Sequence, residues 1–398
     1  MTTTTVGRRS PRIPVDVFAA CGYFLPRLMF LNTQIAPQIH WGDITTALDG
    51  FPSENIDLSS SGFWNEWRQR WVVVAESYVN TATTSTTEAG RTGAWRSAAA
   101  CYHWAEFMYF DDRNVKYSLR QLVRGCFERS LESAPSLIQT ETARLADGTI
   151  VPIWIILPPA APQASATPGS DIRYPCVLIS NGLDSITEME PLSLAETYLA
   201  RGIAAVLYEG PGQGLDLGRT PLLVDIENVV SAVVERVRDH DAIDAERLGF
   251  VGISFGGHLA LRVAQQLSDS FTCVVNFSGG PALAPFAGLP RRLKDDFRFA
   301  FMQPPDADLT RLLADAALDT GVIPQTQVLS VHGALDDIFP IADVVALNEI
   351  WAGRHESQIY ESEAHVCLNK IAHASSRAAD WVHSQLCAAS TSTDREPR

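Results

Sequence analysis

The stretch Leu248–Leu261, with the sequence LGFVGISFGGHLAL, decides how the chain folds. Its first residues form an apolar run typical of a buried strand, and the residues after the glycines have the apolar spacing of a helix. Between them, Gly252-Ile253-Ser254-Phe255-Gly256 matches the G-x-S-x-G turn that joins a strand to a helix. So tight a turn strains the serine backbone and leaves no room for side chains two residues away. We therefore expect the Ser254 hydroxyl to project above a sheet; the alternative is a surface serine in a glycine-rich turn.

The chain after residue 140 alternates between strand-like and helical patterns. Short apolar runs bounded by turn residues predict strands, and longer segments with apolar residues on one side predict helices. Strands that alternate with helices are typical of a mostly parallel sheet covered on both faces. The expected strands are 148–157, 175–180, 203–208, the run before Ser254, 273–277, 327–331 and 358–360, and the expected helices are 190–201, 222–240, 258–267, one from about 342, and 367–386.

The first 140 residues have helical patterns, many aromatic residues and no clear strand pattern. Six of the nine tryptophans lie here, at positions 41, 64, 67, 71, 95 and 104, and most of these rings should fill a core. A few aromatic side chains, with Trp104 and Phe107 as candidates, should contact an apolar substrate, because a helical layer over a sheet forms the roof of its pocket. We expect a helical cap domain over residues 1–140, with 1–12 disordered, an α/β core over 141–389, and a disordered tail over 390–398.

The composition excludes several classes of partner. The chain has 398 residues, 46% of them hydrophobic, so it can bury a large core, and its formal net charge of -15 disfavours nucleic acid and anionic membranes. Its seven cysteines are scattered without C-x-x-C spacing, which argues against a disulfide framework and a zinc site and favours a reducing, cytoplasmic location. No pattern requires a metal or an organic cofactor.

The apolar segment Val15–Asn32 follows two arginines, as in a signal peptide. Pro26 and Arg27 interrupt it, and no small-residue cleavage site follows cleanly. We therefore favour a buried helical segment over a targeting or membrane element. The same segment could form a homodimer interface as easily as part of the cap.

A serine hydroxyl becomes a good nucleophile only when a base removes its proton, so a carboxylate and an imidazole should follow other strands. Asp336 comes shortly after the strand that ends at Val331, in the placement usual for the acid of such a site, and we favour it over the adjacent Asp337. The alternative is a solvated turn in which Asp337 caps the next helix.

The favoured imidazole is His365, which directly follows the last expected strand. His258 lies one helical turn beyond Ser254 and should point away from the hydroxyl, in a structural or supporting role. His332 is too close in sequence to the acid, and a metal site made of His332, Asp336 and His365 lacks any ligand-spacing motif. Of the remaining candidates, His355 precedes the last strand, and His373 and His383 fall within the last helix.

The order Ser254, Asp336, His365 is that of the α/β-hydrolase fold. The chain resembles one branch of that fold, the fungal polyketide-shortening hydrolases and 2,6-dihydroxypseudooxynicotine hydrolase, from about residue 60 to 385. The resemblance rests on four stretches: Asn181–Ser185 with Glu188, Tyr208–Gly214, the turn at Ser254, and Ala100–Asp112.

The resemblance implies a helical cap over the hydrolase core and, in several members, cleavage of a carbon-carbon bond beside a ketone. It also implies that the backbone N–H of Leu183 and that of Phe255 form the oxyanion hole, a role that suits a glycine-flanked turn after a strand. Asp184, in the same turn, is expected to contact the substrate. Asn181 stands where a glycine is commoner, and Glu209 where aspartate is frequent.

These observations lead to a serine hydrolase that acts on an apolar or aromatic, polyketide-like small molecule of secondary metabolism. The bond would be the carbon-carbon bond of a β-diketone, or an ester or thioester. The alternatives are an acyltransferase, a non-hydrolytic cyclase or isomerase, and a pure binding protein. A strained serine with an acid and a base in sequence order argues against a binding protein, which needs none of them.

Overall fold

The computed structural model describes residues 10–392 except 23, 32, 53–55 and 160–172. An eight-stranded sheet forms its centre, in the order β1-β2-β4-β3-β5-β6-β7-β8. The strands are β1 Gln139–Arg144, β2 Ile150–Ile156, β3 Tyr174–Ser180, β4 Ala204–Tyr208, β5 Ile243–Ile253, β6 Cys273–Phe277, β7 Gln327–Gly333 and β8 His355–Tyr360. The expected disorder of residues 1–9 and 393–398 lies outside the described residues.

The sheet is parallel from β4 to β8, while β1 and β2 are antiparallel to their neighbours. This confirms the predicted α/β fold with a mostly parallel sheet. No strand was predicted at β1, whose residues QTETAR are almost all polar. A polar edge strand has no apolar alternation, because only one of its residues, Ala143, is buried.

Two apolar cores lie on the two faces of the sheet. In β3, Val177 and Ile179 join the core beneath α7 and α13, whereas Cys176 and Leu178 join the core beneath α8 and α9. This alternation follows from the strand period of two. The covering helices are α7 Glu190–Leu199, α8 Glu227–Arg238, α9 Phe255–Gln266, α12 Ile341–Ile350 and α13 Ile371–Ser392.

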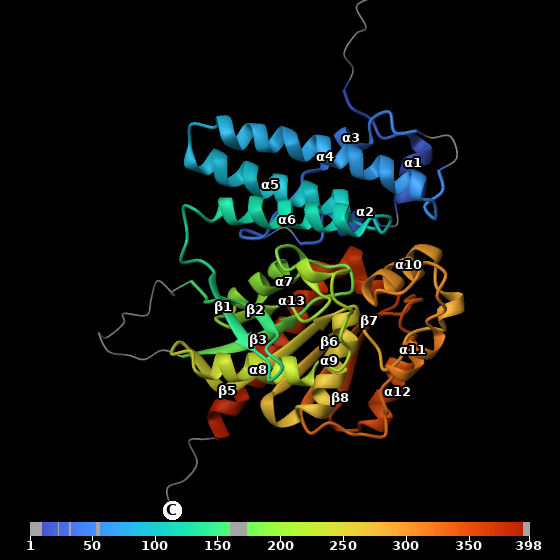
Figure 1. Ribbon diagram of the computed structural model, residues 1–398. Coiled ribbons are helices and arrows are strands. Elements are labelled where there is room, and N and C mark those ends of the chain that lie inside the picture. The colour runs from blue at the N-terminus through green and yellow to red at the C-terminus, as the bar shows by residue number, and fades with distance from the viewer. Residues whose placement is uncertain (1–9, 23, 32, 53–55, 160–172, 393–398) are drawn as a thin grey trace, which may run out of the picture.

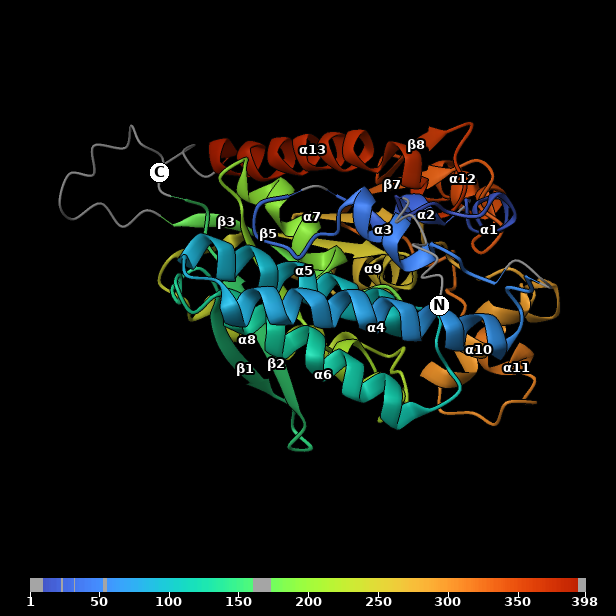
Figure 2. The same cartoon turned by 90° about the horizontal axis from the view of Figure 1, so that it is seen from above.

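Three helices of the N-terminal part form a layer across one end of the sheet (Figure 1). They are α4 Ser61–Thr84, α5 Glu88–Glu106 and α6 Arg113–Ser130. The residue before each helix, Ser60, Thr87 and Asp112 respectively, caps it: its side-chain oxygen accepts a hydrogen bond from a backbone N–H of the first turn. Viewed from above, α4 runs across the molecule and α13 lies along one side (Figure 2).

The segment Val15–Asn32 contains two short helices, α1 Val15–Cys21 and α2 Leu25–Leu28. Val17 and Leu28 are buried in the same core as the tryptophans of α4. The segment is helical, as interpreted, but only partly buried, because Val15, Phe18 and Met29 are exposed. In the part of the chain that the structure describes, no helix is long and apolar enough to cross a membrane. The next helix is α3 Trp41–Leu48.

An insertion between β6 and β7 carries α10 Arg291–Ala300 and α11 Thr310–Asp315 beside the sheet (Figure 1). Several predicted helix limits were wrong; the last helix, expected from residue 367, begins at Ile371. The helix expected from Leu222 begins at Glu227, and the last helix continues to Ser392, into the tail expected to be disordered. Helix ends are poorly defined by pattern alone, because their terminal residues make few core contacts.

The N-terminal core should depend strongly on Trp67, whose ring is fully buried and whose indole N–H donates to the Trp104 carbonyl at 2.7 Å. We expect Trp67→Ala to lower the free energy of unfolding by about 3–5 kcal/mol, through lost burial and the cavity left behind. Trp41, which is 49% exposed, provides the control. Trp41→Ala should cost less than about 1 kcal/mol in the same urea titration followed by circular dichroism, and equal losses would contradict this packing.

Candidate active site

Ser254 lies at the junction of β5 and α9 in strained backbone geometry, with φ 59° and ψ -121°. Its backbone N–H donates to the Phe277 carbonyl of β6 at 2.7 Å, which ties the turn to the neighbouring strand. A positive φ is costly for a residue with a side chain and persists only where its surroundings enforce it.

Glycines on both sides make this turn possible. A Cβ at Gly252 would overlap the carbonyl oxygen of Gly256, and a Cβ at Gly256 would overlap the carbonyl oxygen of Asn181. The backbones of β5, α9 and the loop after β3 therefore approach so closely that only glycine fits.

The structure brings the predicted acid and imidazole to this serine. Ser254 Oγ lies 2.8 Å from His365 Nε2, and His365 Nδ1 lies 2.8 Å from Asp336 Oδ2. Asp336 follows β7, and His365 begins the short helical segment after β8. Asp337 does not cap the next helix; Pro340 occupies the position before α12, and Asp337 lines the adjacent cavity.

The second oxygen of Asp336 accepts the N–H groups of Ile338 at 2.9 Å and Phe339 at 3.0 Å. Burial would raise the pKa of this carboxyl, but His365, His332 and the Phe339 amide together hold it below its ordinary value. Asp336 is therefore ionised at neutral pH and can hold His365 with Nδ1 protonated and Nε2 free to accept a proton.

His332 and His258 are buried next to the site and contact backbone carbonyls near it. His332 lies in β7 with Nε2 3.0 Å from the Phe339 carbonyl and 3.4 Å from Asp336 Oδ2, so its closeness in sequence to the acid reflects a real contact. His258 Nδ1 lies 2.9 Å from the Gly280 carbonyl, away from Ser254 as expected. Burial lowers the pKa of both imidazoles, so both are neutral at pH 7. His355 lies in β8 rather than before it.

A cavity of about 390 Å³ opens onto Ser254 and His365. Its volume suits a small organic molecule. Most of its wall is apolar and comes from the N-terminal helices, the insertion and the loops after β3, β5, β7 and β8, including Phe24, Trp64, Phe107, Leu183, Phe255, Leu293, Phe297, Ile338 and Phe339. In the described part of the chain, no cluster of three or more His, Cys, Asp or Glu side chains could hold a metal ion.

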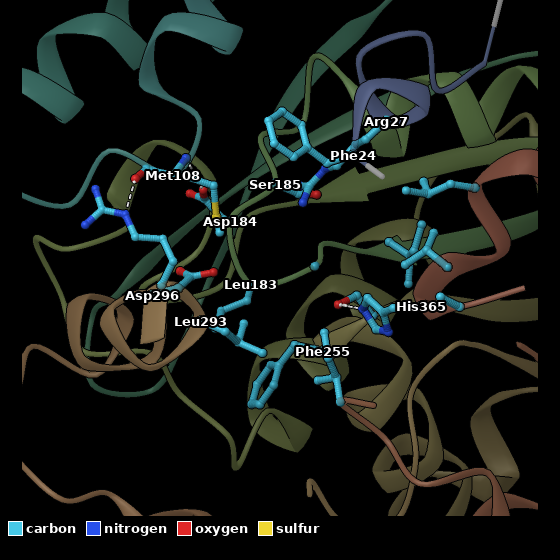
Figure 3. A pocket seen from close by; sticks show the side chains of 18 of the residues that line it. Phe24, Arg27, Met108, Leu183, Asp184, Ser185, Phe255, Leu293, Asp296 and His365 are labelled. Atoms are coloured by element: carbon cyan, nitrogen blue, oxygen red, sulfur yellow. Dashed lines mark hydrogen bonds between the residues drawn. The ribbon is translucent and has the colours of Figure 1, made fainter. Parts of the chain in front are cut away.

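The oxyanion candidates Leu183 and Phe255 both line this cavity (Figure 3). Gly182, before Leu183, approaches Ser254 so closely that a Cβ would lie 3.4 Å from the serine Cβ. The turn after β3 and the first residue of α9 are therefore adjacent to the serine, as an oxyanion hole requires.

Asp184 lines the cavity, but its carboxylate is already paired. Its Oδ1 lies 2.7 Å from Arg120 Nη2 and 2.8 Å from Lys116 Nζ, both on α6. Lys116 and Arg120 also contact Glu106 Oε2, at 2.5 and 3.2 Å. All four of these charged side chains are buried. Their ion pairs connect the turn that carries Leu183 to the helical layer.

The expected substrate contacts Trp104 and Phe107 have different positions. Phe107 lines the cavity. Trp104 does not line it but packs against Phe107, with the centroids of the two rings 5.1 Å apart. We correct the expectation for Trp104. Residues three apart on a helix share a face, but α5 ends at Glu106 and Phe107 has non-helical backbone angles, φ -54° and ψ 128°, so its side chain does not continue the helical face that carries Trp104.

Several polar residues of the cavity wall were not predicted from the sequence. Arg27, from the segment interpreted only as apolar, pairs with Glu190 at 3.2 Å, and both line the cavity. Arg292 and Asp296 reach it from α10. A signal for Asp296 was present, because the pattern Leu293, Asp296, Phe297 places a carboxylate on an apolar helix face.

The fold and this arrangement of residues define an α/β-hydrolase. The chain belongs to the FrsA-like esterase family, whose sequence model matches residues 56–284, and the model of the prolyl oligopeptidase family matches residues 224–388. The protein is thus a hydrolase.

The resemblance found in the motifs is confirmed. The chain is 27% identical over 376 residues to 2,6-dihydropseudooxynicotine hydrolase of Paenarthrobacter nicotinovorans, covering 90% of this chain and 96% of that protein. It is 43% identical over 98 residues, 23% of each chain, to 20-hydroxy-prefusarin hydrolase of Gibberella moniliformis. The crystal structure of 2,6-dihydroxy-pseudo-oxynicotine hydrolase has the same fold, with a TM-score of 0.68, 21% identity, and coverage of 88% of this chain and 94% of that one.

The glycine before the serine can be tested by substitution. Gly252→Ala should prevent the turn from forming and lower the rate of Ser254 modification by a fluorophosphonate at least about 100-fold, because a small displacement of a reacting group is costly. Gly93→Ala is the control: it lies in α5 with no atom near the added Cβ, and should stabilise the helix by about 0.5–1 kcal/mol without loss of modification. Modification of Gly252→Ala at the wild-type rate would contradict the geometry of the turn.

A second prediction concerns His103, which is buried 2.9 Å from Glu106 Oε1 and 3.7 Å from Glu190 Oε1. Burial alone would lower the pKa of His103, but the two carboxylates outweigh it and raise the pKa to about 9. The protonated imidazole therefore stabilises the fold fully below the unfolded pKa of ~6.5, and this contribution, about 3 kcal/mol, is lost as the pH rises through about 9.

We expect the free energy of unfolding of the wild type to fall between about pH 6.5 and 9 relative to that of His103→Gln, measured by urea titration at each pH. Parallel pH profiles of the two proteins would show that His103 is not charged in the folded state.

Proposed function

We propose that this protein is a serine hydrolase in which Ser254 is the nucleophile, His365 the general base and Asp336 the residue that orients the imidazole. The observation that carries the proposal is the chain of two 2.8 Å contacts from Ser254 Oγ through His365 to Asp336, at the wall of a mainly apolar cavity. A strained serine supports it further, because such strain is concentrated at functional sites.

In this proposal Ser254 Oγ attacks the substrate carbonyl carbon while His365 Nε2 takes its proton. The negative charge that develops on the carbonyl oxygen is stabilised by the backbone N–H groups of Leu183 and Phe255. The bond to the leaving group then breaks, and His365 returns the proton to it. Water, deprotonated by His365, hydrolyses the acyl-enzyme and regenerates the serine.

We propose a polyketide-like acyl compound as the substrate, cleaved at the carbon-carbon bond of a β-diketone or at an ester or thioester. A carbon leaving group departs only as a stabilised enolate, so carbon-carbon cleavage requires a second carbonyl in β position. Support comes from the mainly apolar, aromatic cavity, which suits a flat apolar molecule, and from the hydrolase relatives named above. We place this chemistry in the biosynthesis of a secondary metabolite.

Acyl transfer to an alcohol and a non-hydrolytic cyclisation are the alternatives on the same fold. In acyl transfer the serine still becomes acylated, whereas cyclisation needs no covalent intermediate. A covalent intermediate on the serine therefore distinguishes hydrolysis and acyl transfer from cyclisation.

The proposal predicts a single fluorophosphonate adduct on Ser254, detected by intact-protein and peptide mass spectrometry. The adduct should be absent in Ser254→Ala and its rate of formation should fall about 10³–10⁴-fold in His365→Ala, because the base is lost. Asp336→Asn should reduce the rate to a similar degree, because the amide favours the wrong imidazole tautomer.

The control is Ser278→Ala, a buried serine beside the site that none of these steps uses. It should be modified like the wild type. Absence of an adduct on folded wild-type protein, or turnover of β-diketones and aryl esters by Ser254→Ala at the wild-type rate, would refute covalent catalysis and favour a non-covalent reaction.

A further inference from the structure

The acidic residues that line the cavity differ in their ion pairing. Asp184 and Glu190 have cationic partners, Arg120 with Lys116 for the first and Arg27 for the second. Asp296 lines the same cavity and is only 4% exposed, yet its Oδ1 is buried without a hydrogen-bond partner. Within the described part of the chain, no ion pair reaches its carboxyl.

A buried carboxyl without a partner is costly, so its presence in a cavity wall needs an explanation. The wall around it is held firmly. Arg292, one turn earlier on α10, donates from Nε to the Met108 carbonyl at 2.9 Å, and the Met108 N–H donates to Asp184 Oδ2 at 3.4 Å. These two hydrogen bonds hold the loop between α5 and α6 against α10 and the turn after β3. The loop is therefore not free to shift and form a hydrogen bond with Asp296.

We propose that Asp296 recognises a neutral oxygen function of the substrate, a hydroxyl, enol or ketone, at the end of the cavity remote from the scissile carbonyl. This assignment rests on the proposed function and adds a specificity-determining residue to it. In Figure 3, Asp296 lies beside Met108 and Asp184, and His365 lies on the other side of the cavity. A substrate that places its carbonyl at Ser254 would therefore extend its far end toward Asp296, past the apolar side chains of Leu293 and Leu183.

The chemistry around Asp296 favours a neutral partner over a charged one. Burial raises the pKa of Asp296 well above its ordinary value, and the nearby Asp184 raises it further, whereas Lys116, Arg27 and Arg120 lower it less. A neutral carboxyl can donate one hydrogen bond and accept others, which matches a hydroxyl, enol or ketone oxygen. Lys116, Arg27 and Arg120 would repel an ammonium group, and a carboxylate would face Asp184 and Glu190. Arg292, whose buried Nη2 has no hydrogen-bond partner, also lines the cavity and would attract a carboxylate, so the carboxyl ester below tests this alternative.

The test uses 4-nitrophenyl esters of 3-phenylpropanoic acid that differ only at the para position of the phenyl ring. The substituents are hydrogen, hydroxyl, acetyl, aminomethyl and carboxyl. We expect the wild type to prefer the hydroxyl or acetyl ester over the unsubstituted ester by about tenfold in kcat/KM, with most of the difference in KM.

Three variants identify the residue. Asp296→Asn keeps a side chain that donates and accepts, and should retain this preference within about threefold. Asp296→Leu has a similar size but no polar atom, and should reduce the preference to about one. Asp295→Asn changes the neighbouring residue, which pairs with Arg292 and Arg298 and does not line the cavity. It is the control for removing a carboxyl group from α10 and should keep the preference.

Retention of the preference in Asp296→Leu, its full loss in Asp296→Asn, or a wild-type preference for the aminomethyl or carboxyl ester would each overturn the assignment. Fluorophosphonate modification of Ser254 in every variant separates the two proposals. If the wild type and variants are modified but show no such pattern, only the role of Asp296 fails. If folded wild type is neither modified nor active on any ester, the proposed function fails with it.

Discussion

The ion network around Arg120 is the interaction on which the rest of the structure depends. Its guanidinium, fully buried on α6, contacts Glu106 from α5 and, from the loop after β3, the carboxylate and carbonyl of Asp184 and the carbonyl of Ser185. It also reaches the carbonyl of Gly214 in the loop after β4. Buried charges are tolerated only where each has partners, so these groups fix one relative placement of the helical layer and the sheet. The shape of the cavity between the helical layer and the sheet depends on that placement.

The same principle explains the motifs by which the chain resembles its relatives. Glu188 and Glu209, which stand in two of those motifs, both pair with Arg124 of α6, and Glu209 also accepts from the Thr187 hydroxyl at 2.8 Å. Neither lines the cavity that contains Ser254. These acidic residues therefore connect the loops after β3 and β4 to the helices above them. A site that stores strain at Ser254 needs such rigid neighbours, because the surrounding structure must hold the serine in its unfavourable conformation.

Local patterns predicted the strand-turn-helix around Ser254 and the loops that carry Asp336 and His365, because a parallel sheet brings the ends of its strands to one edge. The sequence could not predict contacts between distant segments. Nothing near Arg27 in the chain indicates that it meets Glu190, and only the packed structure shows that Phe107 rather than Trp104 faces the cavity. Asp296 was overlooked for a related reason: a carboxylate in an amphipathic helix is usually solvated, and its burial follows from the position of α10 against the cap.

The origins of the cavity residues divide the site into two parts. Ser254, Asp336 and His365 come from loops at the ends of sheet strands, whose positions are fixed by the hydrogen bonds of the sheet. The opposite wall, with Phe24, Phe107 and Asp296, comes from the N-terminal segment, the end of α5 and the insertion between β6 and β7. None of these segments carries Ser254, Asp336 or His365, so their side chains can vary while those three residues keep their attachment to the sheet. Substrate choice can therefore diverge while the fold is kept, in accord with 27% identity spread over 90% of the chain.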